Sequence, residues 1–184
     1  LPDGAAGMPG VILPRKAVLE LGKLIEDASD PVEVGLSDTK IQFRIGDAVL
    51  TSKLIDGTFP DYQRVIPSGN DKKLVMNCRD FTAAVDRVST ISIEKSRAIK
   101  LALSAGKLLL SASSEESGTA SEELTAEYDA DPMEIGFNAR YLLDITQQIG
   151  GEDIELTLAD SSSPTIVRDL SRESVLFVLM PMRV

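Results

Sequence analysis

The side chains that could support catalysis are few. The chain has 184 residues, no histidine and a single cysteine, Cys78. A lone thiol without histidine offers neither a Cys-His nucleophile nor a metal site. Acidic pairs such as Glu115-Glu116 and Glu122-Glu123 are most simply solvated charges of loops and strand rims. With no phosphate-loop glycine pattern either, the sequence predicts a protein with no catalytic residues, no metal and no cofactor.

Basic residues recur near the starts of three predicted helices. They are Arg15 and Lys16, then Arg79, then Arg140, with Lys23 further along the first helix. The net charge of −10 argues against a broad basic surface for nucleic acid, although a few cations can set the field locally. The ordinary alternative is a solvated helix face, which nearby acids keep close to neutral. Both interpretations stay open at this point.

Two segments carry side chains suited to an extended partner. The linker over residues 56–67 reads D-G-T-F-P-D-Y-Q-R-V-I-P, whereas linkers that only space domains are rich in Gly, Ser or charge. The chain ends in V-L-M-P-M-R-V, where methionines can adapt to several apolar partners and Pro181 stops the last strand. The alternative, a buried last strand with a frayed terminus, is favoured by periodicity alone.

Three stretches repeat one order of elements: a strand, a helix and three strands. Apolar residues at helical spacing mark one face of each helix: Val18, Leu21 and Ile25; Phe81, Ala84, Val85 and Val88; Leu142, Ile145 and Ile149. Pro14 suits a first helical turn and Asn138 an N-cap. The predicted strands cover residues 11–13, 32–36, 41–45, 48–55, 72–77, 98–103, 107–113, 121–128, 133–137, 153–158, 164–169 and 174–180. Helices about sixty residues apart are typical of repeat architecture.

The odd number of units predicts how the chain is divided. One unit covers its own core poorly, so two units should pair into a layered α+β domain. We therefore expect a complete domain over residues 62–184, and over residues 1–61 half of a preceding domain with an exposed apolar face. The chain has no initial Met, no export signal and no run long enough to span a membrane. It reads as part of a longer, cytoplasmic protein.

The repeated unit, the linker G-T-F-P-D-Y-Q-R-V, the segment M-E-I-G-F-N-A-R-Y-L-L-D and the ending V-L-M-P-M-R-V together closely resemble one family. It is the bacterial DNA polymerase III β subunit, the sliding clamp, and the resemblance spans the whole chain in order. It implies a clamp fold in which six units make three domains, and two subunits join head to tail into a ring around duplex DNA. Residues 1–61 would be the second half of the middle domain and residues 62–184 the C-terminal domain.

The resemblance also implies a non-catalytic processivity factor. Such a clamp encircles DNA without reading sequence, and one pocket tethers the DNA polymerase III catalytic subunit, the clamp loader, and other polymerases and repair proteins through short linear motifs. Carried over to this chain, the pocket residues are Pro60, Arg64, Val65, Asn138, Tyr141, Val178, Leu179, Met180, Pro181, Met182 and Arg183. One departure is Ser96, at a position that is often aromatic in the family.

Two further surfaces follow from the resemblance. The helices line the hole, so the DNA-facing residues would be Arg15, Lys16, Lys23, Arg79 and Arg140. The head-to-tail junction of the full-length homodimer would use Thr90, Ile91, Glu116 and Glu122. We expect this shorter chain to be a monomer or to associate through its exposed half-domain. The alternative function is a repeat-built structural or adaptor domain with no nucleic-acid role, and binding of a clamp-motif peptide discriminates the two.

Overall fold

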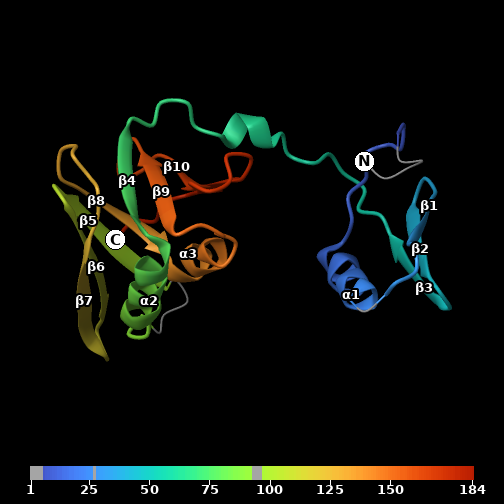
Figure 1. Ribbon diagram of the computed structural model, residues 1–184, viewed down its shortest axis with the longest axis horizontal. Helices are drawn as coiled ribbons and strands as arrows, with labels where there is room; N and C mark the ends of the chain where they lie inside the picture. The colour runs from blue at the N-terminus through green and yellow to red at the C-terminus, as the bar shows by residue number, and fades with distance from the viewer. Residues whose placement is uncertain (1–5, 27, 93–96) are drawn as a thin grey trace. The chain divides into compact units, whose positions relative to one another are not determined.

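The computed structural model describes residues 6–26, 28–92 and 97–184, and its chain divides into two compact units (Figure 1). The first unit is Leu1–Pro60 and the second is Asp61–Val184. Ser96, which the sequence singled out, lies outside the described residues. No helix in the described ranges combines the length and apolar character needed to cross a membrane.

The first unit packs one helix near a three-stranded antiparallel sheet. Its elements are α1 (Arg15–Ile25), β1 (Glu33–Leu36), β2 (Lys40–Ile45) and β3 (Ala48–Lys53), in the sheet order β1-β2-β3. The strict alternation of β2 buries Ile41, Phe43 and Ile45 on one face. The strand predicted over residues 11–13 is wrong, because only an isolated bridge forms there, between Ile12 and Ile55.

The second unit contains the other two repeats. After a short 3₁₀ turn, η1, its elements run in the predicted order, and the bounds of β4 and β9 agree with the prediction. The elements are η1 (Tyr62–Val65), β4 (Lys72–Asn77), α2 (Cys78–Ser89), β5 (Ala98–Ser104), β6 (Lys107–Ser114), β7 (Gly118–Thr125), β8 (Met133–Asn138), α3 (Ala139–Thr146), β9 (Asp153–Leu158), β10 (Thr165–Asp169) and β11 (Leu176–Leu179).

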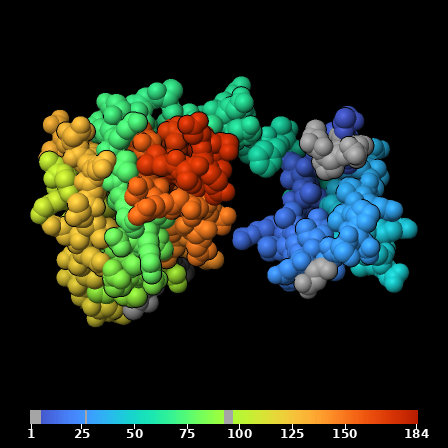
Figure 2. All heavy atoms as spheres, viewed as in Figure 1, coloured from blue at the N-terminus to red at the C-terminus, as the bar shows by residue number. Residues whose placement is uncertain are grey.

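The two repeats of the second unit exchange their first strands. One sheet has the order β11-β10-β9-β4 and the other β7-β6-β5-β8, so β4 joins the later repeat and β8 the earlier one. Figure 2 shows the result as direct contact between segments distant in sequence, with β4 in green against the orange and red of β9 and β10. Neither repeat therefore forms a four-stranded sheet from its own strands alone. The exchange ties the two repeats into one body.

Three isolated bridges fix the register of the repeats. Each joins a residue of the first strand, or of its equivalent, to the segment after the last strand: Ile12 to Ile55, Val75 to Glu127 and Gly136 to Met182. In every repeat the first member lies three positions before the helix begins, at Arg15, Cys78 and Ala139. The bridges therefore identify equivalent positions in the three repeats.

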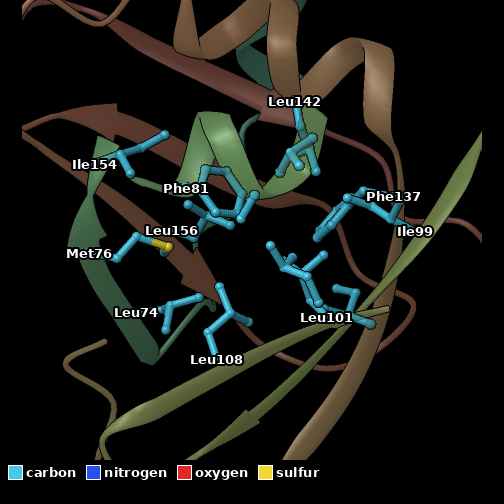
Figure 3. Packing of buried hydrophobic residues seen from close by; sticks show 14 of the residues in the cluster. Leu74, Met76, Phe81, Ile99, Leu101, Leu108, Phe137, Leu142, Ile154 and Leu156 are labelled. Atoms are coloured by element: carbon cyan, nitrogen blue, oxygen red, sulfur yellow. The ribbon is translucent and has the colours of Figure 1, made fainter. Parts of the chain in front are cut away.

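The core of the second unit lies between the two sheets and the two helices (Figure 3). The predicted face of α2 is confirmed, since Phe81, Ala84, Val85 and Val88 are all buried. Ile149 lies beyond the end of α3, although it still packs on the core. β7 begins three residues earlier than predicted because Gly118, with φ of 88°, permits a tight turn after β6.

Candidate functional site

The C-terminal tail lies beside the start of α3. The backbone N–H of Met182 donates to the carbonyl of Gly136 at 2.8 Å, in an antiparallel bridge. Continuing this register by two residues places Met180 level with Asn138. Asn138 is the N-cap of α3, and its side-chain oxygen accepts from the N–H of Arg140 at 2.9 Å. The fold thus brings the predicted tail residues to the predicted residues of the third helix.

The segment between the linker and β4 is fixed to the same end of the second unit. The side-chain amide of Asn70 donates to the carbonyl of Thr157 at 2.7 Å and to that of Pro164 at 2.9 Å. Because Thr165 pairs with Leu179 across β10 and β11, Pro164 comes level with Met180. Asn70 therefore anchors the segment that follows the linker at the point where β10 begins and β11 ends. Asn70 and Pro164 carry no local sequence signal for this role, since the contacts of Asn70 span most of the domain.

Upstream of Asn70 the linker forms the η1 turn. The carboxylate of Asp61 caps this turn by accepting from the N–H of Gln63 at 3.2 Å. Arg64 pairs with Asp61 at 3.1 Å, with both side chains largely exposed. Val65, at the end of the turn, is 55% exposed. The turn therefore presents one cation and one apolar side chain to solvent.

Exposure separates the predicted pocket residues into groups. Met180 and Tyr141 are 62% and 56% exposed, so both large apolar side chains are available to a partner. The residues Val178, Pro181 and Met182 are partly buried, and Arg183 is exposed. Leu179 is only 5% exposed and belongs to the core, so its side chain is not available to a partner. Pro60 belongs to the first unit.

The predicted cations occupy equivalent positions. Lys16, Arg79 and Arg140 are each the second residue of their helix, whereas Arg15 is equivalent to the buried Cys78 and Ala139. Arg79 borders a hollow of about 850 Å³ between α2 and α3, which also contains Asp86 and Glu152. In the first unit, Lys23 pairs with Glu20 at 3.0 Å. The helix faces therefore mix both signs of charge.

All four predicted junction residues lie around α2 and β7. Thr90 ends α2, and its hydroxyl donates to the carbonyl of Arg87 at 2.7 Å. Arg87 also holds the carboxylate of Glu122 with two hydrogen bonds, which lower the pKa of Glu122. Ile91 follows directly and is partly buried, while Glu116 lies in the turn before β7. β7 itself is an edge strand of its sheet.

The single thiol is not placed for chemistry. Cys78 is buried at the start of α2, and this burial raises the pKa of its thiol. Its sulfur lies 4.0 Å from the carbonyl oxygen of Thr146. Within residues 6–26, 28–92 and 97–184, no group of three His, Cys, Asp or Glu side chains could hold a metal ion.

Two repeats that exchange strands into a two-sheet domain, after half of another such domain, define a protein of the sliding-clamp fold. Residues 63–183 match the family described as DNA polymerase III beta subunit, C-terminal domain, and residues 2–61 match its central domain. The chain belongs to the DNA polymerase III β subunit family, as the sequence resemblance predicted.

Individual relatives agree with this assignment. The chain is 51% identical to a beta sliding clamp of Caulobacter vibrioides, over 100% of this chain and 49% of that protein. The beta sliding clamp of Escherichia coli is 38% identical over 94% of this chain and 47% of its own. A Bartonella birtlesii sliding clamp bound to griselimycin has a TM-score of 0.92 at 54% identity, covering 100% of this chain and 50% of that one. The chain thus spans about half the length of these relatives.

Proposed function

We propose that this chain is part of a bacterial DNA sliding clamp, a non-catalytic processivity factor that encircles duplex DNA in the cytoplasm. Residues 1–61 would supply half of the middle domain and residues 62–184 the C-terminal domain. The observation that carries the proposal is that both units match the β subunit family in order, while a backbone bridge joins the tail at Met182 to Gly136, just before α3.

DNA would contact the basic residues near the helix N-termini. A helix N-terminus carries a partial positive charge, so helix stability does not explain a basic residue in each first turn at Lys16, Arg79 and Arg140. A phosphate backbone passing the helix starts does explain it. Arg15 and Lys23 would add to the same surface in the first unit. Few such contacts at once give weak, salt-dependent and sequence-independent binding, which suits a protein that slides.

Replication partners would bind at the end of the second unit through short peptides. An extended peptide needs exposed apolar side chains with a few polar anchors, and Met180, Tyr141 and Val65 supply the apolar part. Arg64, Asn138 and Arg183 supply polar groups. We propose the DNA polymerase III catalytic subunit, the clamp loader and other polymerases and repair proteins as the partners.

Ring closure in the full-length homodimer would use β7. As an edge strand, β7 offers backbone groups to a strand of another subunit. Thr90, Ile91, Glu116 and Glu122 surround this edge, and the Arg87 bond holds Glu122 in place. The junction would thus combine strand pairing with acidic rim contacts.

The test is titration of a labelled clamp-motif peptide, carrying a glutamine and a leucine-phenylalanine pair, into this protein. We expect saturable binding that Met180→Ala weakens roughly tenfold or more, as loss of a central apolar anchor does. Leu170→Ala is the matched control, because Leu170 is 50% exposed but lies at the other end of β10. A folded protein that ignores the peptide, or equal losses in both variants, would favour the adaptor alternative.

A further inference from the structure

Gly136 lies under the last residue of the chain. A Cβ atom built on Gly136 would come within 2.3 Å of Val184 Cγ1 and 2.6 Å of the Met182 carbonyl oxygen. Atoms at such distances overlap. Val184 therefore occupies the space that a side chain at position 136 would need, and a glycine within a strand marks such a close approach.

The other two repeats show that the repeat itself does not require this glycine. The positions equivalent to Gly136 are Ile12 and Val75, and both keep full side chains while making the same bridge. Gly136 has no positive φ, so its backbone conformation does not demand glycine either. What distinguishes the third repeat is that the segment after its last strand folds back over this position.

We propose that Gly136 is a positioning residue, whose empty side-chain space seats Val184 and thereby holds the C-terminal tail, with Met180, at the peptide site. The peptide part of this inference rests on the proposed function. The overlap with the Met182 oxygen is the decisive contact, because that atom is backbone and the N–H of the same residue is bonded to the Gly136 carbonyl at 2.8 Å. Rotating the Val184 side chain cannot relieve this overlap, so a side chain at position 136 requires the backbones of the tail and β8 to move apart.

The first measurement follows the tail without any peptide. In Gly136→Ala, we expect the amide of Met182 to exchange with solvent at least roughly tenfold faster, because the bond that protects it is broken. Gly35→Ala is the matched control: it is also a strand glycine, but its added Cβ meets only Gln42 Cβ at 4.0 Å. Unchanged protection of Met182 in Gly136→Ala would overturn the proposal.

The second measurement is peptide affinity in the same variants, with circular dichroism to confirm the fold. We expect Gly136→Ala to weaken binding roughly tenfold and Gly35→Ala to leave it unchanged, since only the former displaces Met180. If Gly136→Ala does not fold, Val184→Ala tests the same contact by changing its other partner. We expect this variant to weaken peptide binding in the same direction but by a smaller factor. A released tail with unchanged affinity would overturn the positioning role.

The two measurements separate the inference from the function it rests on. If the wild-type protein binds no peptide, the proposed function fails. The role of Gly136 in holding the tail is then tested by Met182 exchange alone. Faster exchange in Gly136→Ala supports this role, and unchanged exchange overturns it.

Discussion

The first repeat and the two later ones share one pattern but not one degree of burial. Through the bridge register, Val18 of α1 is equivalent to Phe81 of α2 and Leu142 of α3. Phe81 and Leu142 are 0% and 1% exposed, whereas Val18 is 52% exposed. Ile25, at 43%, is likewise equivalent to the buried Val88.

The difference shows that the spacing of apolar residues specifies which face of a helix is apolar. Burial of that face requires packing against a second repeat. In α1 the predicted apolar face exists, and Val18 and Ile25 on this face are exposed. Only Ala17 of this helix is buried. In the second unit, α2 packs against α3 and the exchanged strands close the layers around both helices. A single repeat therefore supplies half of a core.

Truncating Phe81 is the largest test of this comparison. We expect Phe81→Ala to lower the free energy of unfolding by about 3–5 kcal/mol, because a fully buried aromatic leaves a cavity. Val18→Ala, at the equivalent position, should change it by less than about 0.5 kcal/mol, as exposed substitutions do. Urea denaturation followed by far-ultraviolet circular dichroism measures both.

One result would contradict the comparison. A large loss in Val18→Ala would mean that Val18 is buried in solution, for instance by association of the exposed face. Repeating the titration at several protein concentrations would detect this, since only association makes the midpoint depend on concentration.

The sequence predicted most of the second unit because its signals are local. The 3.6-residue spacing around Phe81 depends on which side chains face inward, and the structure confirms it. The strand exchange was missed because alternation specifies the faces of β4 and β8 but not the sheet that each joins. The early start of β7 was missed because its turn depends on the conformation of Gly118.

The candidate site was predictable where motifs identify it and not where distant contacts position it. Met180 and Asn138 belong to recognisable segments, and the bridge brings these segments together. Asn70 gave no local signal, since its partners lie 87 and 94 positions away. Gly136 did give one, a glycine inside a strand pattern, which could have indicated a close backbone approach.

Asp169 offers a test of how the second unit is held together. It is 1% exposed, and its carboxylate accepts from the N–H of Gly150 at 2.8 Å and from the hydroxyl of Ser171 at 2.6 Å. These bonds and the Arg172 guanidinium hold the pKa of Asp169 well below its usual range. Asp169→Asn should destabilise the second unit, because an amide places two donors where only acceptors fit. Asp129→Asn, at an exposed position of the same unit, is the control.

The depressed pKa also predicts the direction of the pH dependence. Asp169 contributes stability that is fully present above the pKa of the unfolded carboxyl, about 3.9, and is lost progressively as the pH falls below it. In Asp169→Asn this part of the acid dependence should disappear. Thermal unfolding between pH 7 and pH 3 measures it, and parallel curves for the variant and the wild type would show that Asp169 is not the group responsible.

Helix caps provide the smallest and sharpest comparison of the repeats. Pro14, Asn77 and Asn138 are equivalent N-caps, but only the two asparagines make a side-chain cap bond. The side-chain oxygen of Asn77 accepts from the N–H of Asp80 at 3.1 Å. Asn77→Ala should therefore cost about 1 kcal/mol, whereas Pro14→Ala should change stability by less than about 0.5 kcal/mol. Urea midpoints measure both. Equal losses would mean that the cap bond contributes nothing and that the start of α2 is held only by the packing of β4 in the other repeat's sheet.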